Sequence, residues 1–462
     1  MNNLRVLIMA AGKGTRMVSN RAKVLHTICG TPMLRLIYRA ASGLDPEDVL
    51  VVIGQDAERV RESLHGAKAR FILQAEQLGT GHALMIARPE IEGNHGDLLV
   101  LSGDTPRLKL ETLRHLVEHH RQNGAATTLL TAKTTEPFAY GRILRNSRGG
   151  IEAIVEERDA TPEQRRIEEI NAGFYCFQIP ALLEALAQIS NRNVQAEYYI
   201  TDLVEIQRRR GLKVEALLHP DWEELRGINT RKELADMAKA MRALKNQELM
   251  AAGVSLVDPE HTYIDLDVEV EKDVTIHPMV TLEGATHIGE GSIIHTGTRI
   301  AGSVIGPEVE ILESCLITES EVGRGTTVGP CAHLRAHTSI GEKCRIGNFV
   351  EIKKSTLAAG TKAAHLAYLG DATIGRNVNI GAGVITCNYD GVHKHATIIE
   401  DDAFIGTDSQ LVAPVRIGRG AYVAAGSCIT EDVPPGALGI ARSRQTIKED
   451  WVRRKKETKQ SG

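Results

Sequence analysis

A glycine-rich turn with two cations follows the first apolar run of the chain. Met9–Met17 reads Met-Ala-Ala-Gly-Lys-Gly-Thr-Arg-Met and comes directly after the run Leu4–Met9. Small residues let the backbone approach a phosphate or a base, and exposed N–H groups in such a turn bind anions. Lys13 and Arg16 add positive charge. The spacing is neither the dinucleotide-binding fingerprint nor a P-loop, so the turn alone indicates an anion-binding loop and an ordinary turn equally well.

Two further segments have the residue types of a nucleotide site. Gln74–Ala83 combines amides with a Gly-Thr-Gly turn, which suits contacts to a base edge and a phosphate. Ser102-Gly103-Asp104 follows the apolar run Leu98–Leu101, and an aspartate there is well placed to hold Mg²⁺ against phosphates. Because the carboxyl ends of parallel strands face the ligand crevice, the three segments in this order favour a nucleotide site, although each alone could be a simple turn.

Charged and aromatic residues of the second half form another candidate set. Arg335 and Lys353 are 18 residues apart, and His365 lies in the irregular stretch Lys362–Asp371. Two stacked cations suit a phosphate, whereas the alternative is a solvated basic stripe. A lone histidine is more often structural than catalytic, so the spacing leaves the role of His365 open.

Aliphatic residues that recur every six positions set the scaffold of this half. The three runs are Ile288, Ile294 and Ile300; Val322, Val328, Leu334, Ile340, Ile346 and Ile352; and Ile399, Ile405, Leu411, Ile417, Val423 and Ile429. A helix needs steps near 3.6 and a half-buried strand needs steps of two. The pattern predicts a parallel β-helix with three faces and about 18 residues per coil, which would stack Arg335 on Lys353 and Thr407 on Ala425.

Two stretches break the six-residue phase, at about Lys354–Asp371 and Thr386–Thr397. Both hold polar and aromatic residues, and loops of a solenoid often lie on one face and bind ligands. We therefore predict ligand-binding loops there, with tolerated surface loops as the alternative.

The first half of the chain alternates apolar runs with helical patterns. Leu4–Met9, Val49–Ile53, Leu98–Leu101 and Thr127–Ala132 are predicted strands, and Leu34–Ser42 and Leu110–His120 are predicted helices. This alternation favours a mostly parallel α/β sheet covered on both faces. Leu234, Met237, Met241 and Leu244 then predict one amphipathic connecting helix over residues 230–250.

Composition excludes several classes of protein. The net charge of −4 gives no general attraction to nucleic acid, and the one basic cluster is Arg453–Lys456 in the tail. No apolar run is long enough to span a bilayer, and the N-terminus lacks a signal-peptide pattern. Seven cysteines without paired Cys-x-x-Cys spacing fit reduced thiols in the cytoplasm.

At this point the chain resembles a known family. The sugar-phosphate nucleotidyltransferases are matched by Ala10–Met17, Lys23–His26, Gln74–His82, Gly103-Asp104, Gly141-Arg142, Val155-Glu156, Glu169–Asn171 and Glu197–Asp202. With the hexapeptide half attached, the chain is similar to the bacterial bifunctional N-acetylglucosamine-1-phosphate uridyltransferase and glucosamine-1-phosphate N-acetyltransferase. The resemblance implies a Rossmann-like uridyltransferase domain at 1–229, a linker helix at 230–251, a left-handed β-helix acetyltransferase domain at 252–437 and a basic tail at 438–462.

For the uridyltransferase half, the resemblance assigns residues to UTP, to the sugar phosphate and to Mg²⁺. The nucleotide would be held by Ala10, Ala11, Gly12, Lys23, Gln74, Gly79, Thr80, Ser102, Gly103 and Asp104. The sugar phosphate would be held by Gly141, Glu156, Asn171 and Asn229, and Mg²⁺ by Asp104 and Asn229. Arg16 and Lys23 would neutralise charge while pyrophosphate leaves.

For the acetyltransferase half, the resemblance makes His365 the base that deprotonates the sugar amine. Arg335, Lys353, Tyr368, Asn379 and Lys394 would grip the sugar phosphate. Acetyl-CoA would be bound by Ala382, Asn388, Tyr389, Thr407, Ala425 and Arg442. The family's acetyl site is shared between subunits, which implies a homotrimer, and its product feeds peptidoglycan and lipopolysaccharide synthesis.

Two alternatives remain. One is a different sugar nucleotidyltransferase with a regulatory hexapeptide domain, which would lack the Arg335, Lys353, His365 and Asn388-Tyr389 set. The other is a non-catalytic assembly subunit with the same two folds, which would typically have lost the glycine-rich lysine and Asp104; both are present.

Overall fold

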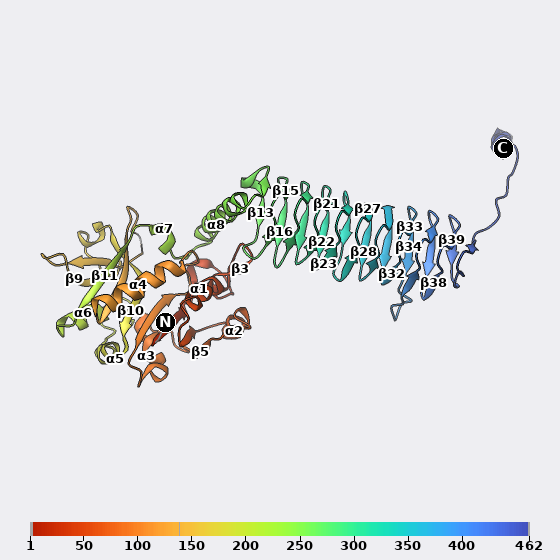
Figure 1. Ribbon diagram of the computed structural model, residues 1–462. Coiled ribbons are helices and arrows are strands. Elements are labelled where there is room, and N and C mark those ends of the chain that lie inside the picture. The colour runs from red at the N-terminus through yellow and green to blue at the C-terminus, as the bar shows by residue number, and fades with distance from the viewer. Residues whose placement is uncertain (1–2, 138, 461–462) are drawn as a thin grey trace. The chain divides into compact units, whose positions relative to one another are not determined.

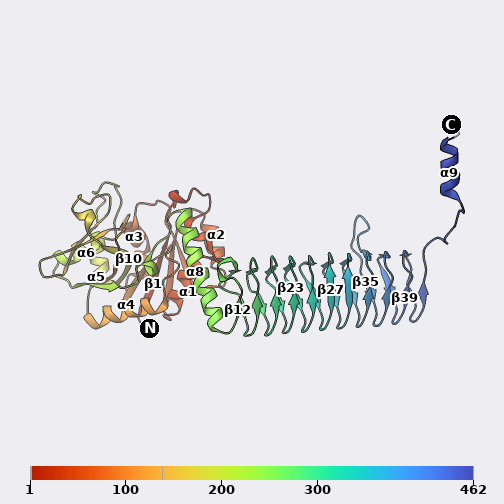
Figure 2. The same cartoon turned by 90° about the horizontal axis from the view of Figure 1, so that it is seen from above.

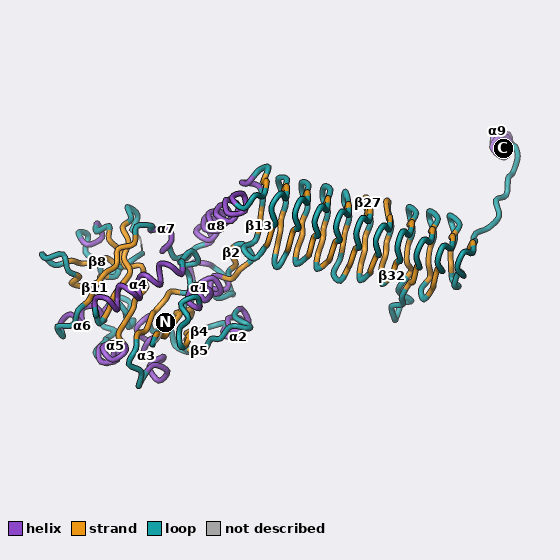
Figure 3. The backbone as a smooth tube through the Cα atoms, viewed as in Figure 1, coloured by secondary structure: helices purple, strands orange, loops and turns teal. Residues whose placement is uncertain are grey.

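The computed structural model describes residues 3–137 and 139–460 and divides into two compact units, Met1–Met241 and Arg242–Gly462. The first combines a sheet with helices, and the second is built from short strands joined by turns (Figures 1 and 3).

The sheet of the first unit has the strand order β11-β7-β10-β6-β1-β4-β5. These strands are β1 (Leu4–Ala10), β4 (Asp48–Ile53), β5 (Arg70–Leu73), β6 (Asp97–Ser102), β7 (Thr127–Lys133), β10 (Glu169–Gln178) and β11 (Val214–His219), while β8 (Arg142–Arg145) and β9 (Ile151–Val155) form a hairpin beside β10. All pairs on the main path are parallel except those of β10, which runs antiparallel to both neighbours. The predicted strands and the mostly parallel sheet are confirmed.

Helices cover both faces of this sheet because its central strands are buried on both sides. Val6 and Ile8 of β1 belong to one core with Leu34 and Leu113, whereas Leu7 belongs to a second core with Leu84. The helices are α1 (Met33–Ser42), α2 (Ala57–Ser63), α3 (Thr80–Ile91), α4 (Leu110–Asn123), α5 (Ile179–Leu186), α6 (Asp202–Arg209) and α7 (Trp222–Leu225), with short 3₁₀ turns at Thr15–Met17, Lys23–Leu25 and Gln164–Arg166 and a small hairpin of β2 (Thr27–Ile28) and β3 (Thr31–Pro32). The side-chain alternation of a strand thus divides one apolar run between two cores.

The second unit is a left-handed parallel β-helix with three sheets. The 11-stranded sheet contains β12 (Ser255–Leu256), β15 (Thr275–Ile276), β18 (Ile293–Ile294), β21 (Glu310–Ile311), β24 (Thr327–Val328), β27 (Arg345–Asn348), β30 (Lys362–His365), β33 (Asn379–Ile380), β36 (Phe404–Ile405), β39 (Tyr422–Val423) and β41 (Leu438–Gly439). The 10-stranded sheet contains β13 (Tyr263–Ile264), β16 (Thr281–Glu283), β19 (Arg299–Ala301), β22 (Leu316–Thr318), β25 (His333–Leu334), β28 (Glu351–Lys353), β31 (Tyr368–Gly370), β34 (Ile385–Cys387), β37 (Gln410–Val412) and β40 (Cys428–Ile429). The 9-stranded sheet contains β14 (Glu269–Val270), β17 (His287–Ile288), β20 (Val304–Ile305), β23 (Ser320–Val322), β26 (Thr338–Ile340), β29 (Thr356–Leu357), β32 (Ala372–Ile374), β35 (Thr397–Ile399) and β38 (Val415–Ile417).

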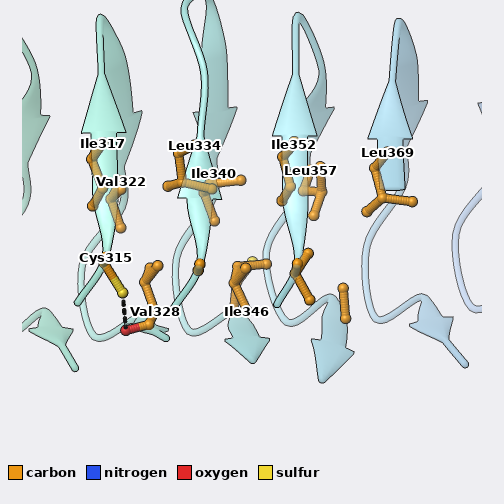
Figure 4. Packing of buried hydrophobic residues seen from close by; sticks show 14 of the residues in the cluster. Cys315, Ile317, Val322, Val328, Leu334, Ile340, Ile346, Ile352, Leu357 and Leu369 are labelled. Atoms are coloured by element: carbon orange, nitrogen blue, oxygen red, sulfur yellow. Dashed lines mark hydrogen bonds between the residues drawn. The ribbon is translucent and has the colours of Figure 1, made fainter. Parts of the chain in front are cut away.

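The six-residue repeat fills the interior of this prism, as predicted. Leu334 pairs in register with Ile352, and Ile352 pairs with Leu369, so each coil places its aliphatic side chain on that of the coil before (Figure 4). These three side chains are fully buried in one continuous core. The period of six therefore follows from burying one side chain per face in every coil.

Only one of the two predicted loops exists. Lys354–Asp371 is an ordinary coil with β29, β30 and β31, because Ala363, Ala367 and Leu369 fill the inward positions; the loop prediction there was wrong. The second stretch does leave the coil path: the chain between β34 and β35 stands out as a loop (Figure 2). We call residues 388–396 the projecting loop.

Helix α8 (Arg231–Ala251) confirms the predicted connecting helix. Met237 is buried and Leu234 and Met241 pack beside it, but Leu244 is 48% exposed, so its assignment to the packing face was wrong. Within the second unit the helix buries Asn246 and Leu249 instead. A 3₁₀ turn, Pro259–His261, follows, and the chain ends in α9 (Trp451–Gln460).

Candidate active sites

Three loops of the first unit meet at the carboxyl edge of its parallel strands. They follow β1, β5 and β6, which lie with β4 in the order β6-β1-β4-β5. The loop after β1 lines two cavities, one through Gly12, Lys13 and Thr15 and the other through Arg16. The sequence prediction that these segments converge is thereby confirmed.

The first cavity, of about 350 Å³, is here called the nucleotide pocket. Its lining residues are Met9, Ala11, Gly12, Lys13, Thr15, Gln74, Gln77, Gly79, Thr80, Ala83 and Glu197. Of the residues assigned to the nucleotide, Ala11, Gly12, Gln74, Gly79 and Thr80 are in this set. Ala10 packs its side chain in the core, so only its backbone is available to a nucleotide.

Gly79 must be a glycine for the nucleotide pocket to form. Its φ is +108°, and a Cβ there would lie 2.5 Å from the carbonyl oxygen of Tyr198. That close packing is secured by two backbone hydrogen bonds, from Tyr198 N to Leu78 O over 2.8 Å and from Gly81 N to Tyr198 O over 2.7 Å. The backbone at the start of α3 therefore packs directly against the segment before α6, with no room for a side chain at residue 79.

The second cavity, of about 210 Å³, is here called the sugar pocket. Its lining residues are Arg16, Ser102, Asp104, Thr105, Ala139, Tyr140, Gly141, Glu156, Asn171, Ala172, Gly173, Leu225, Gly227 and Asn229. All four residues assigned to the sugar phosphate, Gly141, Glu156, Asn171 and Asn229, lie in it. So do Ser102 and Asp104, which the resemblance places at the nucleotide.

Five charged or polar side chains form a network beside the sugar pocket. The Lys23 ammonium contacts the Asp104 carboxylate and lies 3.0 Å from Asn229 Oδ1. Arg16 Nη2 donates to the same Oδ1 over 2.9 Å, and Ser102 Oγ donates to Asp104 Oδ1 over 2.7 Å. Burial by itself would raise the pKa of Asp104, but the Lys23 charge and the hydrogen bonds from Lys23 and Ser102 outweigh it and lower that pKa. Asp104 is therefore a carboxylate at neutral pH.

The oxygens of Asp104 and Asn229 fit a Mg²⁺ ion. The Lys23 ammonium contacts both side chains, so their oxygens lie close enough together to bind one cation. Among residues 3–137 and 139–460, no group of three or more His, Cys, Asp or Glu side chains could hold a metal. Mg²⁺ is commonly bound by one or two carboxylates together with substrate phosphates and water, which is the donor set available here.

Two side chains of the sugar pocket are held by residues that the sequence reasoning did not assign. Asn171 Nδ2 donates to Tyr175 Oη over 2.6 Å, and Thr201 Oγ1 donates to Glu156 Oε1 over 3.1 Å. Burial raises the pKa of Glu156, and the Thr201 hydrogen bond offsets part of that rise. Thr201 stands in the motif segment Glu197–Asp202, which was the available signal; Tyr175 had none beyond its place in a buried strand.

Tyr140 is a further residue that sequence reasoning missed. It lines the sugar pocket, and its hydroxyl accepts the Gly227 N–H over 3.0 Å. Burial raises the pKa of Tyr140 to about 12, so it stays a neutral hydroxyl. Its position directly before Gly141-Arg142 was the only available hint.

In the second unit, His365 is exposed at the end of β30 and pairs in register with Asn348 of β27. Its Nδ1 lies 2.9 Å from Asn348 Oδ1, an oxygen that can only accept, so Nδ1 carries the proton. Nε2 is then left unprotonated in the neutral ring, which is the state a general base needs. Asn348 was not singled out from the sequence, because it lies 17 residues away.

Three cations, Arg335, Lys353 and Lys394, gather on this part of the prism, and the 18-residue spacing predicted that the first two would lie on adjacent coils. Arg335 N donates to Ile352 O over 2.8 Å, which sets Arg335 beside Lys353. The close approach of the Lys394 ammonium, on the projecting loop, lowers the pKa of Lys353, and the Arg335 charge lowers it further. Arg335 is paired with Glu351 at 2.8 Å, and the charge of the nearby Asp371 offsets part of the lowering of the Lys353 pKa. Cations that repel one another in this way make a site for an anion.

Tyr368 and Asn388 adjoin these cations. A Cβ at Gly370, which pairs with Lys353, would lie 2.5 Å from Tyr368 Oη and 2.7 Å from Asn388 Nδ2. Asn388 is buried and donates to Asp371 Oδ2 over 2.5 Å, whereas Tyr389 is exposed in the projecting loop. His365 lies on β30, and Asn379 lies on the next strand of the same sheet, β33.

Ala382, Thr407 and Ala425 form a column along one corner of the prism. Asp408 N donates to Ala382 O over 2.7 Å, and Gly426 N donates to Thr407 O over 2.8 Å. Arg442 continues this column, since a Cβ at Gly426 would lie 3.7 Å from Arg442 Cδ. Thr407 and Ala425 are therefore on neighbouring coils, as the spacing predicts, and an extended ligand could follow the column.

Comparison with known proteins agrees with this division into two kinds of site. Residues 6–168 match the MobA-like NTP transferase domain, and residues 319–354 and 396–431 match the bacterial transferase hexapeptide model with six repeats. The chain is 47% identical over 460 residues to the bifunctional protein GlmU of Pelobacter propionicus, covering 99% of this chain and 100% of that protein. It is 47% identical to GlmU of a Geobacillus species, covering 97% of each chain, and 46% identical to GlmU of Listeria welshimeri, covering 98% and 99%.

Across the described residues, every helix is either too short or too polar to cross a bilayer.

Proposed function

The chain belongs to the family of bifunctional GlmU proteins, and on that premise we propose how its residues divide two activities between two sites. The protein is a bifunctional transferase. One activity acetylates glucosamine-1-phosphate with acetyl-CoA, and the other transfers uridylyl from UTP to N-acetylglucosamine-1-phosphate and releases pyrophosphate. The observation that supports the assignment most directly is the network of Arg16, Lys23, Asp104 and Asn229 beside the sugar pocket.

The nucleotide pocket has the hydrogen-bonding groups that uracil requires. Gln74 is buried, and within the described residues its Oε1 has no partner, while the Gly79 N–H also has none. An acceptor and a donor side by side complement the N3–H and O4 of uracil. We assign base recognition to Gln74 and Gly79, with Gly12 and Thr80 at the ribose and phosphates.

In the sugar pocket, Glu156 and Asn171 bind the hydroxyl and acetamido groups of N-acetylglucosamine-1-phosphate. Its phosphate oxygen attacks the α-phosphorus of UTP in line, the bond to the β-phosphate oxygen breaks, and pyrophosphate leaves. Arg16 and Lys23 offset the negative charge that develops, and losing either cation should cost roughly 10²–10³ in rate. Mg²⁺, when bound by Asp104 and Asn229, would neutralise phosphate charge; Lys23 and Arg16 then remain available to the phosphates.

In the second unit, the uncharged sugar amine attacks the thioester carbonyl of acetyl-CoA, and His365 Nε2 accepts the one proton that the nitrogen releases. The carbon–sulfur bond breaks, the amide forms, and the CoA thiolate leaves. Asn348 holds the imidazole in the required tautomer. Arg335, Lys353 and Lys394 bind the sugar phosphate with Tyr368 and Asn379, and the corner column of Ala382, Thr407, Ala425 and Arg442 binds CoA together with Asn388 and Tyr389.

We also propose a homotrimer in the cytoplasm. Phe404 and Tyr422 stack on adjacent coils with ring centroids 5.1 Å apart and remain 39% and 53% exposed, which suits contact with a neighbouring prism. The seven cysteines all lie among the described residues and are reduced thiols, as expected in a reducing compartment.

A coupled assay tests the two activities together. The full chain is supplied with glucosamine-1-phosphate, acetyl-CoA, UTP and Mg²⁺, and free thiol and pyrophosphate are scored separately. Thiol should appear without UTP, and pyrophosphate should require either acetyl-CoA or ready-made N-acetylglucosamine-1-phosphate. Pyrophosphate release from UTP and unacetylated glucosamine-1-phosphate at the same rate would contradict the proposal.

A further inference from the structure

The side-chain amide of Gln74 has two chemically opposite ends, so its orientation decides which base it can read. Uracil carries a donor at N3, whereas cytosine carries an acceptor at the same ring position. The Gln74 oxygen facing the nucleotide pocket therefore accepts from uracil and opposes cytosine, and the flipped amide would do the reverse. Discrimination between UTP and CTP thus requires something that prevents the flip.

Two groups contact the Gln74 amide nitrogen. Nε2 lies 3.2 Å from the carbonyl oxygen of Gly79 and 3.0 Å from Nδ1 of His82. A carbonyl oxygen only accepts, so the nitrogen end of the amide must face Gly79. Its second hydrogen then points at His82, whose Nδ1 must be unprotonated to accept it.

The His82 ring is itself held in place. His82 is in the first turn of α3, whose start is fixed by the hydrogen bond from Gly81 N to Tyr198 O over 2.7 Å. Its ring lies 6.3 Å from the ring of Tyr198, centroid to centroid. The imidazole does not line the nucleotide pocket, so its influence on a nucleotide passes through Gln74.

We infer that His82 is a positioning residue for base selection: by accepting the second amide hydrogen of Gln74 at Nδ1, it keeps Oε1 of Gln74 directed at the base and so favours UTP over CTP. This inference rests on the proposed uridylyl transfer and adds a residue to it. The flipped amide would place Oε1 against the Gly79 carbonyl and lose that hydrogen bond, and it would keep a bond to His82 only if the ring moved its proton from Nε2 to Nδ1. Without His82, only the Gly79 contact opposes that flip.

The test compares two replacements of His82 in the full chain. His82→Phe keeps a ring but removes the acceptor, and His82→Asn supplies an amide oxygen near the position of Nδ1. Both are assayed with N-acetylglucosamine-1-phosphate, Mg²⁺ and either UTP or CTP. For His82→Phe, the UTP-to-CTP ratio of kcat/KM should fall roughly three- to tenfold, the value of about one hydrogen bond, through a higher KM for UTP. His82→Asn should keep the ratio within about twofold.

Further measurements separate positioning from a general structural effect. Acetyl-CoA-dependent thiol release should be unchanged in both variants, because that site lies in the other unit. In a Gln74→Leu background, adding His82→Phe should leave the UTP-to-CTP ratio where Gln74→Leu set it. If His82→Phe does not fold, His82→Leu replaces it as the variant without an acceptor and must give the same drop.

An unchanged ratio in the variant without an acceptor would overturn the inference. So would an equal loss in His82→Asn, or a further loss in the Gln74→Leu background. A wild-type chain that releases no pyrophosphate from UTP would instead overturn the proposed function, and the two failures are thereby distinguished.

Discussion

Arg16 Nη2 donates a hydrogen bond to Asn229 Oδ1 over 2.9 Å and so joins residues that are 213 positions apart. Lys23 reaches the same oxygen, over 3.0 Å, and also contacts Asp104. Three segments therefore bring charged or polar side chains to one point beside the sugar pocket. They are the loop after β1, the end of β6 and the segment before α8. Each prediction below tests a contact of this kind.

Replacing Asp104 by alanine should reduce UTP-dependent pyrophosphate release by at least roughly 10²–10³, because the carboxylate that organises Lys23 and the phosphates is lost. Acetyl transfer should be nearly intact. The reverse holds for His365→Ala, since the base lies in the other unit. Both rates are measured on each variant in the assay with separate thiol and pyrophosphate readouts.

Matched controls for this pair are Asp236→Ala, an exposed aspartate of α8, and His287→Ala, on the β-helix away from His365. Neither should change either rate more than about twofold. Loss of both activities in both Asp104→Ala and His365→Ala would contradict independent sites.

Asn348→Ala should lower kcat for acetyl transfer roughly tenfold, because the His365 ring loses the acceptor that fixes its tautomer. KM for glucosamine-1-phosphate should change little, since Asn348 is not among the phosphate-binding cations. Asn377→Ala, which removes a corner asparagine bonded to Asp402, is the control. A fall in Asn348→Ala no larger than that in Asn377→Ala would rule out the orienting role.

Lys394→Met should raise KM for glucosamine-1-phosphate roughly tenfold, with kcat little affected, because one of three cations facing the phosphate is removed. It should also raise the pKa of Lys353, whose value is lowered mainly by its contact with Lys394 and by that residue's charge. Initial rates give KM, and NMR titration of the lysine side chains gives the pKa. The control Lys362→Met replaces an exposed lysine of β30 and should alter neither KM nor the pKa of Lys353. An unchanged pKa of Lys353 in Lys394→Met would contradict the proposed cluster of cations.

Asp202 makes the stability of the first unit depend on pH. Burial, and then the charges of Glu205 and Asp159, raise its pKa from 3.8 to about 6. An acid whose pKa is higher in the folded state contributes stability below its unfolded pKa, and that contribution is lost as the pH rises through about 6. Asp202→Asn should therefore be more stable than the wild type at pH 8, by on the order of 1 kcal/mol after solvent screening, and no more stable at pH 3.5.

Trp222 is the one tryptophan of the first unit, so its fluorescence in a Trp451→Phe background follows urea unfolding there. Glu111→Gln, at an exposed carboxylate in the first turn of α4, is the control and should show no such pH dependence. Equal gains in the free energy of unfolding for Asp202→Asn at pH 8 and at pH 3.5 would contradict the raised pKa of Asp202.

Much of the fold could be predicted because burial leaves a periodic trace in the sequence. The aliphatic steps of six predicted the prism, and the apolar runs before Gly12 and Asp104 predicted the strands β1 and β6. The strand before Gln74, β5, was not predicted. The same reasoning failed at Lys354–Asp371, where alanines filled the inward positions and polar residues faced out. It failed again at Leu244, because a helical stripe does not show which of its residues a neighbouring element covers.

The candidate sites were less accessible to such reasoning. Residue types and family motifs singled out His365, Asp104 and Lys353 and several of their neighbours, but not Asn348, which fixes the tautomer of His365. Asn348 contacts His365 because one coil of the prism takes 17 residues here, so the two residues pair in register on neighbouring strands. Tyr140 lines the sugar pocket and Thr201 donates a hydrogen bond to Glu156 there, although both lie in or beside family motifs that gave no specific role to either residue.

The sequence by itself determined which stretches coil, which form strands and which turns can bind an anion, because these are local consequences of side-chain size, polarity and spacing. Only the tertiary structure decided that Arg16 meets Asn229, that Asn348 orients His365 and that His82 holds Gln74. Such contacts depend on the directions in which side chains point once distant backbone segments are packed together, and no local pattern encodes those directions.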